Sequence, residues 1–307
     1  MAQEQATRNE PILVLGGTGT VGSRLAKQLT HEGFPVLVAS RNGKKSPSSP
    51  PSIDDQHATH VTFDWNDPDT WNNVFTAAKD GIRSVYLIAP PGILDGDRVM
   101  TEFIDFARDR GARRFVLQSA SSIEAGGPVM GKVHAYLREL GTQGEVEWGV
   151  VRPTWFQQNL AEQANHANSI RDESKLYSAT SEGKIPWVSA DDIAAVAMRL
   201  LTNVDPPNTE YVVLGPELLS YEDIAQILSE VLGRKIVHVD LTTADLEKRH
   251  TQYGMPVGYA KMMSALDTSI KFGAENRTND VILSVTGAAP RKFRDYALSV
   301  KDVWVGA

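Results

Sequence analysis

The chain has 307 residues, of which 41% are hydrophobic and 22% are charged. That balance is typical of a globular protein and excludes a wholly disordered chain. Aspartate and glutamate outnumber lysine and arginine by 38 to 31, and the net charge of −7 argues against binding to nucleic acid or to an anionic membrane surface. The sequence contains no cysteine, which excludes disulfides and thiolate chemistry and is typical of a reducing compartment.

The N-terminal sequence predicts neither export nor membrane insertion. Its first ten residues are polar and lack the apolar segment of a signal peptide. The longest apolar runs, 12–15 and 86–91, are far shorter than a bilayer requires. We therefore expect a cytoplasmic protein with a disordered segment at 1–10 and without membrane or nucleic-acid partners.

Short runs rich in β-branched residues then alternate with helical patterns. The predicted strands lie at 11–15, 35–39, 60–63, 84–89, 114–118, 148–151 and 210–214, and predicted helices include 22–31, 67–78 and 99–110. This alternation predicts an α/β fold with a doubly wound parallel sheet covered by helices on both faces. The Pro- and Ser-rich segment 43–59 is predicted to be a mobile surface loop, because proline opposes a helix there.

The second half of the chain predicts a smaller lobe. Ser189 and Ser220 each precede a helical pattern as N-cap residues, and the second of these helices ends at Gly233. We predict a nucleotide-binding domain over 11–152 and a C-terminal substrate-binding lobe over 153–307. Elements near 190–214 are expected to return to the main sheet.

A glycine-rich segment over 16–22, with the spacing Gly-x-x-Gly-x-x-Gly, joins the first predicted strand to the first helix. In a Rossmann-type fold such glycines permit a tight turn, a close approach of the backbone to a pyrophosphate, and packing of the helix on the strand. The helix N-terminus then faces the phosphate charge. The residues predicted to bind the cofactor here are Gly16, Thr18, Gly19, Thr20, Val21 and Gly22.

The end of the second strand indicates which cofactor is bound. A site for NAD places a carboxylate there to bind the ribose hydroxyls, whereas this strand ends in Ser40 and Arg41. A hydroxyl and a guanidinium suit a 2′-phosphate, so the prediction is NADPH. Lys44 and Lys45 either add to the positive field or are solvated loop charges.

Ligands of such sheets bind at the carboxyl ends of the strands. This rule places Asp64 and Trp65 near the adenine and Ala89 and Pro90 beside the ribose. Two serines after the fifth strand, Ser119 and Ser121, would reach the nicotinamide end. Their hydroxyls could equally cap the backbone.

The usual catalytic pair of a short-chain dehydrogenase, Tyr-x-x-x-Lys, does not occur at any of the eight tyrosines. The predicted helix 128–140 instead carries Lys132, His134 and Tyr136. We predict Ser121, His134 and Tyr136 as catalytic residues, with a structural role for the histidine as the alternative. A site without the pair suits an iminium, which needs a hydride but no proton, and it equally suits a protein that binds the cofactor without chemistry. The histidine spacing supports no metal site.

Four segments carry a family resemblance. With the glycine segment, residues 114–119, 151–159 and 215–224 resemble the NmrA-like atypical short-chain dehydrogenases. More narrowly, residues 133–137, 183–193 and 290–294 are similar to the fungal festuclavine and agroclavine dehydrogenases of ergot-alkaloid pathways. The resemblance covers nearly the whole chain.

The resemblance implies NADPH-dependent reduction of a cyclic iminium in an indole-derived ring system, and so a cationic, polycyclic small-molecule partner. Trp155, Phe156 and Trp187 would surround such a cation with ring faces, unless they pack in the core. The glycine loop departs from the family, which has Arg and Lys where this chain has Thr18 and Thr20. That departure predicts an altered cofactor affinity or another substrate.

Two other functions remain open. One is a regulator that senses NADP(H) without turnover, because a fold does not fix a function. The other is an enone or quinone reductase, which needs a proton donor such as His134.

Overall fold

The structure is a computed structural model that describes residues 10–43, 56–79, 81–90 and 96–305. The chain divides into two compact units, Met1–Arg152 with Ile193–Val212, and Pro153–Asp192 with Val213–Ala307. The predicted disordered terminus and most of the predicted loop at 43–59 lie outside the described residues, although a strand already begins at Ala58.

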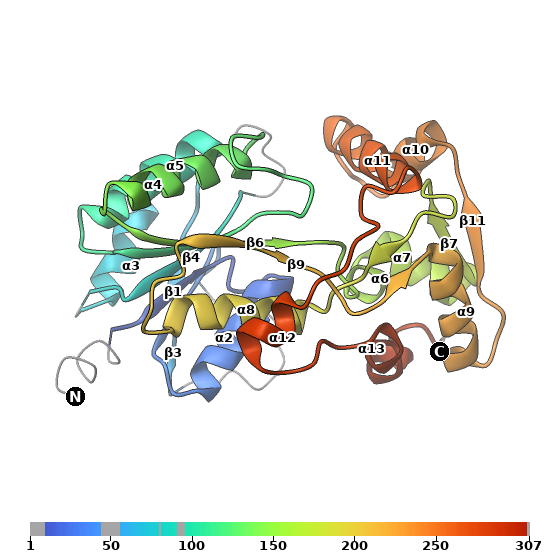
Figure 1. Cartoon of the computed structure of the whole chain (residues 1–307), viewed down its shortest axis with the longest axis horizontal. Coiled ribbons are helices and arrows are strands. Elements are labelled where there is room, and N and C mark those ends of the chain that lie inside the picture. The colour runs from blue at the N-terminus through green and yellow to red at the C-terminus, as the bar shows by residue number, and fades with distance from the viewer. Residues whose placement is uncertain (1–9, 44–55, 80, 91–95, 306–307) are drawn as a thin grey trace. The chain divides into compact units, whose positions relative to one another are not determined.

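The first unit is built on a seven-stranded sheet with the strand order β3-β2-β1-β4-β5-β6-β9 (Figure 1). These strands are β1 (Ile12–Leu15), β2 (Val36–Ser40), β3 (Ala58–Thr62), β4 (Ser84–Ile88), β5 (Arg114–Gln118), β6 (Glu147–Pro153) and β9 (Thr209–Val213). Every pair from β3 to β6 is parallel, with Ile12 beside Val36 on one side and Ser84 on the other. The chain thus winds outward from β1 in both directions, which confirms the doubly wound sheet and puts its switch point between β1 and β4.

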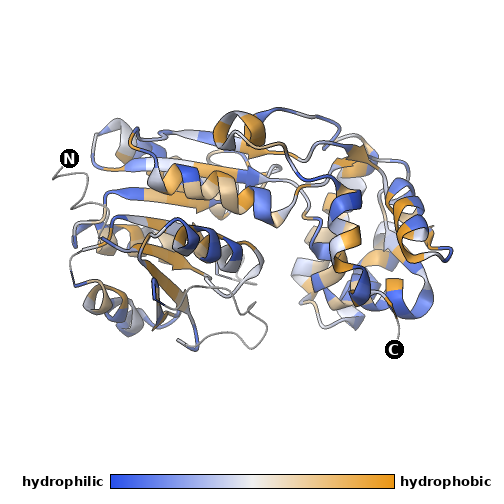
Figure 2. Cartoon of the chain, turned by 90° about the horizontal axis from the view of Figure 1, so that it is seen from below, coloured by the Kyte–Doolittle hydropathy of each residue, from blue (hydrophilic) through white to orange (hydrophobic). Residues whose placement is uncertain are grey.

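Helices cover both faces of this sheet (Figure 1). One face carries α3 (Trp71–Ala77), α4 (Asp97–Arg108) and α5 (Met130–Thr142), and the other carries α2 (Thr20–His31) and most of α8 (Ala190–Thr202). The central strands β1, β2, β4 and β5 are buried along nearly their whole length, and much of the sheet is coloured as hydrophobic in Figure 2, as expected of strands that are covered on both faces.

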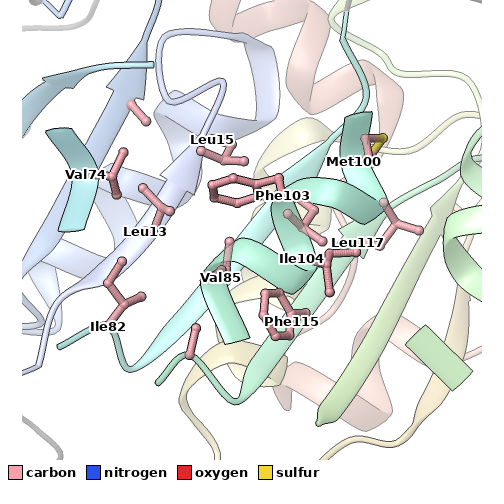
Figure 3. Close-up of a cluster of buried hydrophobic side chains, with 14 of the residues drawn as sticks. Leu13, Leu15, Val74, Ile82, Val85, Met100, Phe103, Ile104, Phe115 and Leu117 are labelled. Atoms are coloured by element: carbon pink, nitrogen blue, oxygen red, sulfur yellow. The ribbon is translucent and has the colours of Figure 1, made fainter. Parts of the chain in front are cut away.

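The core of the first unit is centred on Phe103 of α4. This helix buries Met100, Phe103, Ile104 and Ala107, the spacing of one helical face. Figure 3 shows the Phe103 ring beside Leu15 of β1, in the layer between the helices and the sheet. Three aromatic rings meet Phe103 edge-on at centroid distances of 5.1–5.5 Å, namely those of Phe63, Trp65 and Trp71. This cluster fixes the helical layer against the sheet.

The second unit is mainly helical. Its helices are α6 (Asn159–Glu162), α7 (Ala164–Asn168), α9 (Tyr221–Leu232), α10 (Thr243–Gln252), α11 (Val257–Lys271), α12 (Val281–Thr286) and α13 (Phe293–Val300). Its strands are β7 (Lys175–Ser178), β8 (Ile185–Pro186), β10 (Leu218–Leu219) and β11 (Val237–Asp240), paired as β7 with β11 and β8 with β10. As predicted, Ser220 caps α9, in a capping box with Asp223, and Gly233 ends it in the left-handed conformation. None of the helices in the described part of the chain is long and apolar enough to cross a bilayer.

A buried carboxyl group lies between two elements of this unit. Asp267 of α11 is 6% exposed, and its Oδ2 accepts a hydrogen bond of 3.2 Å from the Ala179 N–H. Burial raises the pKa of Asp267 to about 7, because the charged form has lost its hydration. The carboxyl group in the folded protein therefore still holds its proton at a pH where the unfolded chain has released it.

This pKa predicts that the free energy of unfolding falls as pH rises from about 4 to about 7, since the folded state binds more protons over that interval. Asp267→Asn retains an acceptor for Ala179 and has no charge to bury. We expect its unfolding free energy to exceed that of the wild type at pH 8 by about 2–4 kcal/mol, and to lose most of this pH dependence. Urea denaturation at pH 4.5 and pH 8 measures both quantities. Exposed Glu182→Gln is the matched control, and an unchanged pH dependence in Asp267→Asn would contradict the assignment.

Candidate functional site

The turn between β1 and α2 is built from glycine. Gly16 adopts φ +63°, a left-handed backbone conformation that residues with a side chain rarely adopt. The turn is closed by hydrogen bonds from the Gly19 N–H to the Gly16 carbonyl at 2.9 Å and from the Gly17 N–H to the Ala39 carbonyl at 3.0 Å. These bonds join the turn to the end of β2, so the first two strands present one continuous edge.

Helix α2 comes unusually close to this turn. A Cβ atom on Gly22 would lie 2.3 Å from the Gly16 carbonyl oxygen, and one on Gly17 would lie 2.6 Å from Cγ1 of Val38. No side chain caps the helix at Gly19, and no acidic residue lies in its first turn. The first amides of a helix have no acceptor within the helix, and they carry the positive end of its dipole. The start of α2 is therefore suited to an anion such as a phosphate.

A cavity of about 150 Å³ opens beside this turn, at the carboxyl ends of β1, β2 and β4. Its lining brings together eight of the predicted cofactor residues, Gly16, Thr18, Ser40, Arg41, Asp64, Trp65, Ala89 and Pro90. Ala39, Phe63, Asn66 and Ile88 complete the wall. The predicted Thr20, Val21 and Gly22 form the first turn of α2.

The cavity is lined by both polar and apolar groups. The Ser40 hydroxyl is buried and makes no hydrogen bond to any residue that the structure describes, whereas Arg41 is exposed beside it. The Asp64 carboxylate accepts the Asn66 N–H at 2.9 Å and so shapes the loop after β3. Trp65 packs edge-on against Phe63 at 5.0 Å. A buried hydroxyl without a partner among the described residues, an adjacent cation and an apolar wall fit the adenosine half of a dinucleotide. Lys44 and Lys45 lie outside the described residues.

The loop after β5 lies across the switch point from this cavity. The Ser119 N–H donates to the Val151 carbonyl at 2.8 Å, while its hydroxyl is buried and, within the described chain, has no partner. Ser121 is 2% exposed, and its carbonyl accepts a hydrogen bond from Arg152 at 2.9 Å. Both serines thus belong to an ordered loop held against β6.

Helix α5 does not present the predicted proton carriers. The Tyr136 hydroxyl donates to Asp105 of α4 at 2.6 Å, and burial together with this bond raises its pKa to about 12. Lys132 bonds to Asp97, at the start of α4, at 3.0 Å. The Tyr136 hydroxyl, which is predicted to be catalytic, thus joins α5 to α4 in this structure.

His134 is also part of the packing. It is 1% exposed, and its ring lies 5.5 Å from that of Trp148 on β6. Burial lowers the pKa of His134, which favours the neutral imidazole at neutral pH. This burial supports the structural role of His134, which is the alternative to its predicted catalytic role.

Of the three aromatic residues predicted to bind the substrate in the second unit, one is buried and two are partly exposed. Trp187 is 1% exposed, donates its indole N–H to the Leu219 carbonyl at 3.2 Å and meets the Tyr221 ring edge-on at 5.2 Å. These contacts support core packing, which is the alternative to the predicted role of Trp187 in substrate binding. Trp155 and Phe156 are partly exposed and pair with Val188 through the backbone. They remain candidates for binding a substrate.

Two glutamines in the same segment were missed by the sequence analysis. Gln158 is 1% exposed and accepts the Ala190 N–H at 2.8 Å, at the start of α8. Gln157 is fully buried and donates to the Arg291 carbonyl at 2.9 Å. Their partners lie far along the chain, so no local pattern could reveal these roles. Across the described residues, no three histidine, aspartate or glutamate side chains gather to hold a metal ion.

A parallel sheet with its glycine turn, bare helix N-terminus and strand-end cavity defines a Rossmann-type, nucleotide-binding protein. The model of the NmrA-like family matches residues 8–296, and the chain belongs to that family. Its relatives identify it as an oxidoreductase. It is 45% identical to festuclavine synthase II of Penicillium roqueforti over 95% of this chain and 99% of the relative. It is 41% identical to agroclavine dehydrogenase of Claviceps fusiformis over 96% of this chain and 98% of the relative.

The fold is shared with solved reductases. The structure of the Citrobacter sp. triphenylmethane reductase complexed with NADP(H) superposes with a TM-score of 0.75. The match covers 94% of this chain and 99% of the reductase at 20% sequence identity, which shows a common fold.

The close approach at Gly22 predicts the effect of a single methyl group. Gly22→Ala places a Cβ against the Gly16 carbonyl, so α2 must move away from the turn. We expect the Kd for NADPH to rise by about 10- to 100-fold, because this is the change in affinity that the loss of one or two charge-assisted hydrogen bonds produces. Fluorescence titration measures the Kd, and Ser23→Ala on the same turn of the helix is the control. Equal affinities for NADPH in the two variants would contradict the role of Gly22.

Proposed function

We propose that the protein is an NADPH-dependent reductase that transfers hydride to a cyclic iminium of an indole- or ergot-type alkaloid intermediate. The observation that carries this proposal is the engagement of Tyr136 with Asp105 and of Lys132 with Asp97. Tyrosine and lysine are residue types that can protonate a carbonyl oxygen, but those of α5 instead join two helices. The names of the relatives, a festuclavine synthase and an agroclavine dehydrogenase, support the same substrate class.

The chemistry of an iminium fits such a site. Bound NADPH supplies a hydride. An iminium group whose carbon accepts the hydride becomes a neutral amine, and no proton transfer is needed. The protein's task is then to bind, orient and exclude water. The glycine turn and the start of α2 would hold the pyrophosphate, and Ser40 and Arg41 would hold the 2′-phosphate.

The second unit supports the substrate side of this proposal. Trp155 and Phe156 are partly exposed aromatic residues, and we assign their ring faces to the ligand. A flat, cationic ring system is attracted to such faces by cation–π interaction. The proposal therefore assigns them to the substrate and leaves Trp187 to the core.

Arg41 is predicted to set the preference for NADPH over NADH. Arg41→Ala removes the guanidinium that would bind the 2′-phosphate, so we expect the Kd for NADPH to rise by about 10- to 100-fold while the Kd for NADH changes less than about twofold. Lys27→Ala removes an exposed positive charge from α2 and is the matched control. A parallel loss of affinity for both cofactors in Arg41→Ala would contradict this assignment.

The proposed reaction is tested directly with NADPH and a panel of cyclic iminium salts, enones, quinones and simple ketones. We expect NADPH oxidation with the iminium salts, followed at the nicotinamide absorbance band. Turnover with quinones or enones alone would favour the corresponding reductase. Tight NADPH binding without turnover on any acceptor would favour a sensor. Either result would overturn the proposal.

A further inference from the structure

Arg152 occupies an unusual position at the end of β6. Its side chain is 3% exposed, although it carries a full charge. The guanidinium donates to both carboxylate oxygens of Glu124, at 2.6 and 3.0 Å, and to Glu210 of β9. It also donates to the Ser121 carbonyl at 2.9 Å and lies 3.4 Å from the Ala120 carbonyl. One side chain thus ties the loop after β5 to two neighbouring strands.

The loop held by Arg152 does not adopt a relaxed conformation. Val129, at its far end, has φ +45° and ψ −99°, a region that is unfavourable for a β-branched residue. A Cβ atom on Gly131 would lie 2.4 Å from the Glu124 carbonyl oxygen, so the loop folds tightly onto the start of α5. Such a backbone persists only where the surrounding structure imposes it. Backbone hydrogen bonds from Lys132 and Val133 to the Val129 carbonyl hold this far end, and Arg152 holds the near end through its bonds to residues 120, 121 and 124.

The loop after β5 lies where the nicotinamide half of a bound dinucleotide is expected. The cavity lies at β1, β2 and β4, and a dinucleotide that starts there extends across the switch point toward β5. The Ser119 hydroxyl lies at that end of β5, buried and, among the residues that the structure describes, without a hydrogen-bond partner. A buried hydroxyl is costly to leave unsatisfied, so it is a ready contact for a polar ligand group.

We infer that Arg152 is a positioning residue that fixes the loop 119–124 beneath the nicotinamide half of the cofactor. This inference rests on the proposed function. Arg152 acts through the loop, whose backbone and Ser119 hydroxyl meet the cofactor. The planar guanidinium is required because it serves two carboxylates and a carbonyl at once, which a lysine ammonium does not match.

A matched control lies at the opposite end of β5. Arg114 is also a buried arginine, with a side chain that is 9% exposed, and it donates to Glu147 at 2.6 Å and to the Asn203 carbonyl. It belongs to the same sheet and a similar network, but it lies at the amino end of the strand, away from the cavity. Arg114→Lys therefore reports the structural cost of changing a buried arginine without disturbing the loop.

The test compares Arg152→Lys with Arg114→Lys in the full chain, at a temperature well below the Tm of each variant. We expect Arg152→Lys to lower kcat by about 10- to 100-fold, to change the Kd for NADPH less than about threefold, and to enlarge the isotope effect with deuterated NADPH. Its bound NADPH should also show weaker nicotinamide fluorescence. Arg114→Lys should lower the Tm and leave kcat and fluorescence near the wild-type values.

Equal kcat and equal fluorescence in the two variants would overturn the inference, as would a loss of kcat in Arg152→Lys that merely follows the folded fraction. The wild type separates this failure from that of the proposed function. If the wild type binds NADPH but reduces no acceptor, the proposed function fails, and the fluorescence of bound NADPH still decides the role of Arg152. If the wild type does not bind NADPH, both fail.

Discussion

The first unit depends on the contact between Gly22 of α2 and the Gly16 carbonyl at the end of β1. No side chain larger than hydrogen fits between them, because a Cβ atom would lie 2.3 Å from that oxygen. The contact fixes where α2 begins, and so it directs the first amides of the helix to the edge of the sheet. Gly17 likewise leaves no room for a side chain, because a Cβ atom there would lie 2.6 Å from Cγ1 of Val38 on β2. The cavity, the turn and the helix N-terminus are thus consequences of one close approach between helix and sheet.

The polar groups of α5 show how packing removes residues from chemistry. Tyr136 and Lys132 are bonded to Asp105 and Asp97, and His134 is buried against Trp148. Each group is of a type that transfers protons in other enzymes, but here Tyr136 and Lys132 join α5 to α4, and His134 packs against β6. What remains for the reaction is the binding and orientation of the cofactor, which is the contribution that proteins make when a cofactor carries the chemistry.

The features that could be predicted from the sequence are those with local causes. The strands of the sheet, the glycine turn, the Ser220 N-cap and the Gly233 stop follow from patterns within a few residues, and the structure confirms them. The roles of Tyr136 and Arg152 could not be predicted, because their partners Asp105 and Glu210 lie 31 and 58 residues away. Trp187 illustrates the same limit, since an aromatic residue in a conspicuous motif fits a core as well as a binding site until its neighbours are known. The cavity residues were accessible to prediction because strand ends of a parallel sheet converge on one edge.

Arg152 and Asp267 show two ways in which this protein buries charge. Asp267 has a single amide donor, and its carboxyl group responds to burial by retaining its proton. For Arg152, burial alone lowers the pKa, but the hydrogen bonds that it donates to Glu124 and Glu210 outweigh burial and raise the pKa overall. Its charge is therefore permanent, and the loop after β5 is held in the same way across the physiological pH range. A site that lacks a titrating acid gains from such a constraint, because the barrier to hydride transfer then depends on geometry rather than on protonation.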